Sequence, residues 1–256
     1  MIMTTGYRHN LEAARIYRTW TQRCDKTLFM SDDFHDEIQP VIISKNEEWG
    51  KLKESLTFVY NYHYHNADWF LRAADDNFVI LENLRYLLYP YSNKTPIYFG
   101  YKLKNKDGEA YMSSSAGYVL SKEALRRFVK SALPNTEICT PGANGKESEE
   151  LARCLKNVGV LAGDSRAEDG SNTFFPFSLS DYLKGLKPED HKFLYENSFY
   201  AMRNKSFPLS KKMISFSNVH RDDLYTLEYF IYNMRVFGQK RLPAQLPIIE
   251  NPVEIK

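Results

Sequence analysis

Two adjacent carboxylates, Asp75 and Asp76, follow an apolar segment at residues 69–71 and precede a stretch with helical spacing at 79–88. Carboxylate oxygens are the groups with which proteins hold hard cations. In α/β sheets, ligands bind outside the carboxyl ends of the strands, so this pair is a candidate ligand site. An acidic pair in this position is also typical of a helix N-terminus, where the helix dipole favours negative charge. Both interpretations remain open at this point.

The elements that would position this pair alternate between short apolar segments and stretches with helical periodicity. The strands are expected at residues 1–4, 27–30, 41–43, 69–71, 97–100, 160–163 and 213–216, and the helices at 12–20, 49–63, 79–88, 122–133, 149–158 and 223–234. Ser121 is expected to cap the helix that follows it. This alternation predicts an α/β fold with a mostly parallel, doubly wound sheet that is flanked by helices.

The size and charge of the chain limit its class. With 256 residues and 43% hydrophobic content, it can bury a substantial core, as one large domain or two small ones. The net charge is +2 and the basic residues are scattered, so nucleic acid is not an expected partner. The chain contains no apolar run of about 18 residues and opens without a signal-peptide pattern, so no anchor is expected within it. Residues 1–238 are expected to form one domain, and the proline-containing residues 239–256 an extended C-terminal arm.

Some residues are expected to serve the fold rather than chemistry. Cys139 and Cys154 are close enough in sequence to close a small loop, if the compartment oxidises them. The three tryptophans, Trp20, Trp49 and Trp69, are interpreted as core aromatics rather than platforms for stacking a sugar.

Ten short segments, in order along the chain, resemble the core 1 β1,3-galactosyltransferase family within the fringe-like β1,3-glycosyltransferases. They are Ile2-Met3-Thr4, Arg18-Thr19-Trp20 with Arg23-Cys24, Phe29-Met30-Ser31, Trp49-Gly50-Lys51, Ala67-Asp68-Trp69-Phe70, Pro96-Ile97-Tyr98-Phe99-Gly100, Tyr111-Met112-Ser113, Ala116-Gly117-Tyr118-Val119-Leu120-Ser121-Lys122-Glu123-Ala124, Ala162-Gly163-Asp164-Ser165-Arg166 and Phe175-Pro176-Phe177. The resemblance extends over roughly residues 2–238.

The resemblance implies a GT-A type nucleotide-sugar glycosyltransferase fold. It implies UDP-galactose as donor, Mn²⁺ as cofactor, and inverting transfer of galactose to O3 of N-acetylgalactosamine linked to Ser or Thr of a glycoprotein. It further implies a type II membrane protein of the Golgi or ER lumen, whose anchor would lie upstream of this chain. A homodimer, or pairing with an active relative, is the expected assembly.

The family's metal motif, Asp-Asp-Asp, corresponds to Ala74-Asp75-Asp76. The resemblance assigns donor binding to Asp75 and Asp76, and the direct metal contact to Asp76. The first carboxylate is replaced by the methyl group of Ala74. A second metal ligand in the family, the His of a Ser-Phe-His motif, corresponds to Ser217. His220 is the nearest imidazole, either as a replacement ligand or as a surface residue.

The family's catalytic base belongs to a Glu-Asp motif that corresponds to Glu147-Ser148. A serine hydroxyl is too weak a base at neutral pH to replace the carboxylate. Glu149 and Glu150 are therefore the candidate substitutes, and solvated carboxylates in the first turn of a helix are the alternative.

A glycine-rich loop in the family, Gly-Gly-Ala-Gly, reads Ser114-Ser115-Ala116-Gly117 in this chain. The resemblance places Ala116 and Gly117 at the donor. Glycine allows close approach of the backbone to a ligand, so the two serine side chains are expected to narrow the pocket or shift the loop. Substrate selectivity is expected to change accordingly.

Two functional hypotheses follow. The first is a core 1 type galactosyltransferase with a modified site. The second is a catalytically impaired family member that acts as a glycan-binding or chaperone-like partner of active relatives. The replacements at Ala74, Ser148 and Ser217 leave the enzymatic activity as an open question, because all three fall on positions that carry the family's chemistry.

Overall fold

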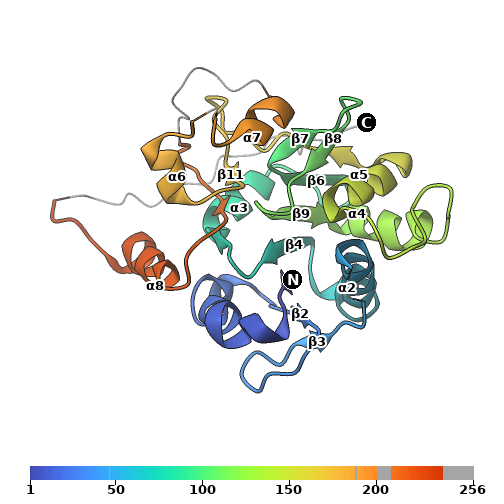
Figure 1. Cartoon of the computed structure of the whole chain (residues 1–256), viewed down its shortest axis with the longest axis horizontal. Helices are drawn as coiled ribbons and strands as arrows, with labels where there is room; N and C mark the ends of the chain where they lie inside the picture. Colours follow the sequence, from blue (N-terminus) through green and yellow to red (C-terminus); the bar gives the residue numbers. More distant parts are fainter. Residues whose placement is uncertain (46, 188, 201–208, 239–256) are drawn as a thin grey trace.

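The computed structural model describes residues 1–45, 47–187, 189–200 and 209–238 (Figure 1). The arm predicted for residues 239–256 lies outside the described residues. A seven-stranded sheet forms the centre, in the order β10-β6-β9-β4-β1-β2-β3. Its strands are β1 (Ile2–Met3), β2 (Phe29–Ser31), β3 (Val41–Ile42), β4 (Trp69–Ala74), β6 (Ile97–Gly100), β9 (Tyr118–Ser121) and β10 (Leu161–Ala162). The predicted α/β class is confirmed.

The central sheet is mixed. Four of its six strand pairs are parallel, and β9 is antiparallel to both of its neighbours, β4 and β6. The chain reaches β9 through a hairpin, β7 (Lys102–Lys104) and β8 (Ala110–Met112), rather than through a crossover helix. A parallel neighbour would need such a crossover, so the hairpin dictates the antiparallel direction.

Helices cover both faces of the sheet. The α-helices are α1 (Ala14–Tyr17), α2 (Glu48–His63), α3 (Leu81–Leu88), α4 (Lys122–Arg127), α5 (Glu147–Asn157), α6 (Leu179–Lys184), α7 (Lys192–Asn197) and α8 (Asp223–Glu228). Short 3-10 and π-helical turns are η1 (Gly6–Arg8), η2 (His9–Ala13), η3 (Trp20–Arg23), η4 (Tyr64–Asn66), η5 (Phe128–Ala132) and η6 (Tyr229–Asn233). Ser121 caps α4 as predicted, because its side chain accepts a hydrogen bond from the backbone N–H of Ala124.

Two hydrophobic cores lie on opposite faces of the sheet. Along β9, Val119 belongs to one core and Leu120 to the other, as the period of two of a strand requires. The second core packs under α2, α4 and α5, which group together in Figure 1. Trp20 and Trp49 are fully buried, which confirms their assignment as core aromatics, while Trp69 is partly buried against the first core.

Some predicted helices differ in their limits. The helix expected at 79–88 begins at Leu81, because Phe78 and Val79 form strand β5 instead. β5 pairs antiparallel with β12 (Ser215–Phe216), which also pairs with β11 (Phe174–Phe175) in a small second sheet. The helix expected at 149–158 begins earlier, at Glu147, and the one expected at 12–20 is η2 followed by α1.

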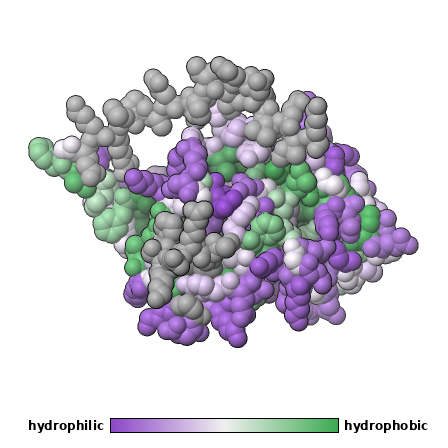
Figure 2. Space-filling model, turned by 90° about the horizontal axis from the view of Figure 1, so that it is seen from above, coloured by the Kyte–Doolittle hydropathy of each residue, from purple (hydrophilic) through white to green (hydrophobic). Residues whose placement is uncertain are grey.

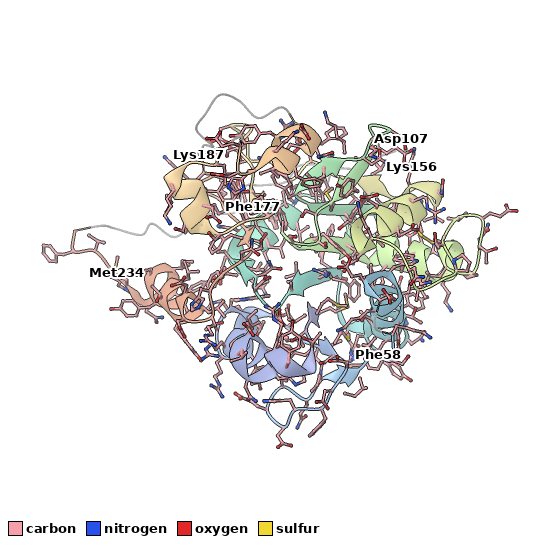
Figure 3. All side chains as sticks on the ribbon, in the orientation of Figure 1. Phe58, Asp107, Lys156, Phe177, Lys187 and Met234 are labelled. Carbon is pink, nitrogen blue, oxygen red and sulfur yellow. A yellow bond between two sulfur atoms is a disulfide. The ribbon has the colours of Figure 1, made fainter. Side chains whose placement is uncertain are left out.

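Helix α5 is held near its C-terminal end by two contacts. Cys139 and Cys154 form a disulfide with a Cα–Cα distance of 5.0 Å, as the sequence spacing indicated. Figure 3 shows Lys156, in the last turn of α5, close to Asp107 in the turn of the β7–β8 hairpin. Lys156 also donates a hydrogen bond to Glu109 in that region, at 2.5 Å.

The visible face in Figure 2 is largely hydrophilic, with small hydrophobic areas between the polar residues. Within the part of the chain that is described, no helix combines the length and apolar composition needed to cross a membrane.

The disulfide yields the first prediction. A chain with both Cys139→Ser and Cys154→Ser should lose about 3 kcal/mol of stability, because a bridge across about 15 residues restricts the unfolded chain. Its melting temperature under non-reducing conditions should fall by about 6–12 °C. Cys24→Ser, which removes the free thiol, is the control and should leave the bridge intact. Equal melting temperatures for the double variant and the native chain would contradict the prediction.

Candidate functional site

The acidic pair lies at the carboxyl end of β4, in the turn that leads into β5. β1 runs parallel beside β4, with Met3 opposite Ala74. The next residues of both strands are therefore neighbours, and Thr4 Oγ1 donates a hydrogen bond to Asp75 Oδ2 at 2.6 Å. The register of two strands thus builds the first contact of the site.

Asp75 also forms an ion pair with an arginine. Arg8 Nη2, in η1, lies 3.0 Å from Asp75 Oδ1, and Arg8 Nε lies 3.7 Å from Glu12 Oε2. The side chain of Asp75 is only 3% exposed. Burial raises the pKa of Asp75 to about 6, although the Thr4 hydrogen bond and the Arg8 charge oppose this rise. Burial likewise raises the pKa of Asp76, again against the charge of Arg8.

Asn77 holds the acidic turn in shape. Its Oδ1 accepts a hydrogen bond from the backbone N–H of Ala74 at 2.7 Å, and its Nδ2 donates to the carbonyl of Ser115 at 2.7 Å. The indole N–H of Trp20 donates to the backbone carbonyl of Asn77 at 2.9 Å. Asn77 is fully buried, so the turn and the Ser114–Gly117 loop are fixed to each other.

The loop predicted to meet the donor does lie beside the acidic turn. Gly117 has a φ of +75°, and a Cβ there would stand 3.0 Å from the carbonyl oxygen of Arg72 and 3.7 Å from Asn77 Oδ1. A side chain would be strained by both the backbone conformation and this close approach. The carbonyl of Ala116 accepts a hydrogen bond from Ser215 Oγ at 2.6 Å. Donor binding by Ala116 and Gly117 stays a prediction.

The end of β12 closes the other side of the turn. The backbone N–H of Val219 donates to the carbonyl of Asp76 at 3.0 Å. Ser217, at the family's histidine position, is buried, and its hydroxyl has no hydrogen-bond partner among the described residues. His220 points outward instead: its side chain is 64% exposed, and its Nδ1 lies 3.7 Å from Asp222.

The first turn of α5 is committed to the fold. Glu147 Oε2 forms a buried ion pair with Arg72 Nη2 at 2.6 Å, and Glu147 Oε1 accepts a hydrogen bond from the Tyr118 hydroxyl at 2.8 Å. Ser148 Oγ accepts a hydrogen bond from the backbone N–H of Ser114 at 3.0 Å. The Glu-Asp position of the family is therefore occupied by an internal brace rather than by a free carboxylate.

The two predicted substitutes for the base, Glu149 and Glu150, carry neighbours of their own. Glu149 pairs with Lys146 at 3.1 Å. Glu150 Oε2 accepts a hydrogen bond from Thr140 Oγ1 at 2.6 Å and pairs with Arg153 at 2.8 Å. Burial would raise the pKa of Glu150, but these two hydrogen bonds outweigh it and lower the pKa. Both carboxylates lie in the first turn of α5, as both interpretations require, and their catalytic role stays a prediction.

Manganese needs several oxygen or nitrogen ligands. The described residues contain no cluster of three or more His, Cys, Asp or Glu side chains that could hold an ion. Ala74 offers no ligand, and Asp75 is engaged by Thr4 and Arg8. Asp76 and the Ser217 hydroxyl are the side-chain donors that remain. These residues do not fit a manganese site with three protein ligands, and manganese binding stays a prediction.

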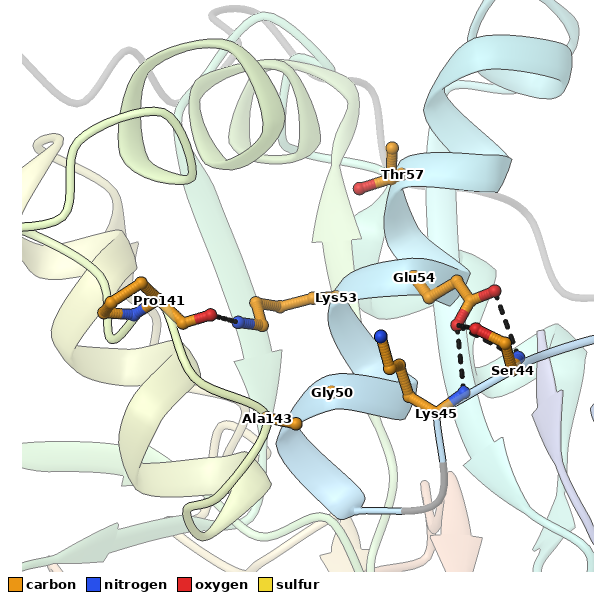
Figure 4. Close-up of a pocket in the computed structure, with 8 residues that line it drawn as sticks. All are labelled: Ser44, Lys45, Gly50, Lys53, Glu54, Thr57, Pro141 and Ala143. Carbon is orange, nitrogen blue, oxygen red and sulfur yellow. Dashed lines mark hydrogen bonds between the residues drawn. The ribbon is translucent and has the colours of Figure 1, made fainter.

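A cavity of about 390 Å³ lies apart from this turn, between α2 and the loop before α5 (Figure 4). The side chain of Lys53 extends from α2 across this cavity, and its Nζ donates hydrogen bonds to the carbonyls of Thr140, Pro141 and Gly142. Glu54 accepts hydrogen bonds from the backbone of Ser44. None of the residues predicted for the site lines this cavity.

Three side chains at the turn, Thr4, Arg8 and Asn77, were not among the predicted site residues. Thr4 follows the first apolar segment of the chain, and parallel strands end at one edge of a sheet. Its place beside the acidic pair could therefore have been predicted from the sequence. Asn77 directly follows the acidic pair. Arg8 lies in a short 3-10 turn that no periodicity marks.

The buried brace gives a second prediction. Glu147→Ala should lower the free energy of unfolding by about 3–5 kcal/mol, because it leaves the buried Arg72 charge without a partner. Chemical denaturation measures this change. The variant Glu149→Ala in the same helical turn is the control and should stay within about 0.5 kcal/mol of the native chain. An equal change in the free energy of unfolding in both variants would contradict the prediction, because it would show that pairing with Arg72 gives Glu147 no special contribution to stability.

The buried Asp75 gives a third prediction, on pH. Its pKa in the folded state, about 6, is above the ordinary value of 3.8, so the folded chain holds this proton more tightly than the unfolded chain. The resulting stability is fully present below pH 4 and is lost as pH rises through 6, by about 3 kcal/mol. Asp75→Asn should remove that part of the pH dependence in denaturation experiments between pH 4 and 7. An unchanged profile would contradict it.

The sequence is similar to a known protein family and to two characterised relatives. Residues 1–150 match the model of the Fringe-like family. Over 255 residues, which is 98% of this chain and 70% of the relative, the sequence is 34% identical to glycoprotein-N-acetylgalactosamine 3-beta-galactosyltransferase 1 of Xenopus laevis. Over 154 residues, 57% of this chain and 30% of the relative, it is 26% identical to beta-1,3-glucosyltransferase of Mus musculus. The chain therefore belongs to the Fringe-like glycosyltransferases of the GT-A fold, as a member of β1,3-galactosyltransferase type.

Proposed function

We propose that this protein binds UDP-galactose and transfers galactose, with inversion, to O3 of N-acetylgalactosamine on Ser or Thr of a glycoprotein. The observation that carries the proposal is the acidic turn at the end of β4, fixed by Asn77 against the Gly117 loop. The identity to a galactosyltransferase that acts on N-acetylgalactosamine, over nearly the whole chain, supports both substrates.

The proposed compartment is the lumen of the Golgi or ER. The Cys139–Cys154 disulfide supports it, because such bonds persist in oxidising compartments.

The residues have separate parts in the proposed reaction. Asn77 fixes the turn, and Gly117 lets the backbone approach the donor without a side chain in between. Inversion follows when the acceptor O3 attacks the anomeric carbon as the diphosphate leaves from the opposite face. Ser148 offers no carboxylate to take the O3 proton, and Glu147 is already bound to Arg72 and Tyr118, so in the proposed step the proton passes to solvent water. A positioned general base contributes about 10²–10⁴-fold in rate, so slow transfer is expected.

A second candidate is a family member that binds glycan or active relatives without turnover. The specific observation in its favour is that three positions of the family's chemistry hold other residues: Ala74 has no carboxylate, Ser148 braces the Ser114 loop, and the Ser217 hydroxyl is buried. The packing around these three positions is intact, as expected of a protein that keeps the family's fold in order to bind a glycan or an active relative.

The fourth prediction separates the two candidates. With purified protein, UDP at millimolar concentration should raise the melting temperature, and transfer from UDP-galactose to an N-acetylgalactosamine peptide should be measurable but slow. Asp76→Asn should reduce transfer at least about 10-fold, because a carboxylate accepts a hydrogen bond from a sugar hydroxyl of the donor more strongly than a neutral amide does. Asp222→Asn, which changes an exposed carboxylate near His220, is the control.

Transfer that survives Asp76→Asn unchanged would remove Asp76 from the reaction. UDP binding without any transfer would favour the second candidate. Absence of both would contradict the proposed donor.

A further inference from the structure

The positive charge at the acidic turn comes from the protein itself. Arg8 is paired with Asp75 at 3.0 Å, at the site where the described residues do not fit a three-ligand manganese site. We propose that the Arg8 guanidinium, and not a divalent cation, is the group that binds the diphosphate of the nucleotide in this protein. This inference rests on the proposed function, because it assumes a nucleoside diphosphate at the turn.

The backbone around Arg8 is held firmly in place. The N–H of Gly6 donates to Asp32 Oδ1 at 2.8 Å, and the N–H of Arg8 donates to the carbonyl of Thr5 at 3.0 Å. A Cβ at Gly6 would stand 2.7 Å from Cβ of Asp33, so the 3-10 turn is pressed against the residues that follow β2. This packing presents Arg8 to the carboxyl end of β4 from a fixed base.

The guanidinium retains hydrogen-bonding capacity. Arg8 forms ion pairs with Asp75 and Glu12, and its buried Nε has no hydrogen-bond partner among the described residues. Its side chain is 28% exposed, so part of it is open to a ligand. A guanidinium carries five N–H donors in a planar fork that matches two oxygens of a phosphate. Arg8 can therefore remain beside Asp75 while another edge of the fork binds a diphosphate.

A second cation lies at the same edge of the sheet. Lys51 Nζ, from α2, donates to the carbonyl of Thr4 at 2.5 Å. Thr4 also donates a hydrogen bond to Asp75, the partner of Arg8, so Lys51 and Arg8 contact two residues that contact each other at this edge. Burial lowers the pKa of Lys51, and the negative charges of Asp32 and Asp75 oppose this only in part. Two cations thus offset the carboxylates that a bound diphosphate would otherwise meet.

The same ion pair could instead be a lock that closes the turn to ligands. The two roles predict opposite effects of removing the arginine. If Arg8 binds the diphosphate, its loss weakens nucleotide binding. If Arg8 only neutralises Asp75, its loss frees a carboxylate, and both nucleotide and Mn²⁺ binding strengthen.

The test uses UDP as the probe and isothermal titration calorimetry on the native chain, Arg8→Gln and Arg8→Lys, each in EDTA and in Mn²⁺. The native chain should bind UDP in EDTA, and Mn²⁺ should change its Kd by less than about threefold. Arg8→Gln should raise the Kd about 10–100-fold, the effect of losing charge-assisted hydrogen bonds. Arg8→Lys keeps the charge without the fork and should fall between the two. It also provides a folded variant if Arg8→Gln does not fold.

The matched control is Arg18→Gln, which removes another arginine from an ion pair, the one with Glu37 away from the turn. It should leave the Kd for UDP unchanged. UDP binding that requires Mn²⁺ would overturn the inference while leaving the proposed function standing. Equal or tighter binding by Arg8→Gln would overturn it in favour of the lock, and absence of UDP binding in every condition would overturn it together with the donor. Arg8-dependent binding in EDTA supports it even if no galactose is transferred.

Discussion

The parallel pairing of β1 with β4 is the constraint on which the site depends. The pairing puts Met3 opposite Ala74, and this register places Thr4 against Asp75 and η1 beside the acidic turn. A shift of one residue would turn every side chain of β1 to the other face of the sheet. It would exchange Ile2 and Met3 between the two cores and separate Thr4 from the carboxylate. The hydrophobic pattern of a two-residue strand therefore determines the chemistry at its end.

Strand β4 also carries the second polar centre of the molecule. Arg72 lies within the strand and cannot be buried without a counter-charge, which Glu147 of α5 supplies. The hydroxyl of Tyr118, in β9, donates a hydrogen bond to Glu147 and holds it in place. Arg72 further donates to the carbonyl of Ser114, so the same group supports the loop beside the acidic turn. The residues in the first turn of α5 therefore stabilise the fold. Because the Arg72–Glu147 pair at this turn also holds the Ser114–Gly117 loop, it couples the stability of the fold to the shape of the acidic turn beside that loop.

Prediction from sequence succeeded where the signal is local. The residues of α2 and β6 carry a clear period or a continuous apolar run, and Ser121 has the side chain of an N-cap, so these elements were recognisable. Strand β5 was missed because Phe78 and Val79 become a strand only through β12, which is distant in sequence. The position of the acidic pair followed from its strand. The partners of the pair did not, because the approach of Arg8 depends on how η1 packs on the residues after β2, and no local pattern encodes that contact.

The residues at the turn all favour an arginine over a metal ion as the source of positive charge. Ala74 and Ser217 offer a metal ion neither a carboxylate nor an imidazole, and Arg8 places a positive charge next to Asp75, one of the two carboxylates of the turn. Two unit charges 4 Å apart repel by about 4 kcal/mol at an effective dielectric constant of 20, and a divalent ion would double this. Arg8 on Asp75 and a metal ion on the neighbouring Asp76 would therefore repel each other, and each missing ligand moves the balance toward the arginine. A carboxylate that is buried and already paired also gains less from a metal, because its charge is partly neutralised. The Arg8–Asp75 ion pair and the absence of ligand groups at Ala74 and Ser217 therefore favour the same arrangement, in which an arginine rather than a metal ion supplies the positive charge at this turn.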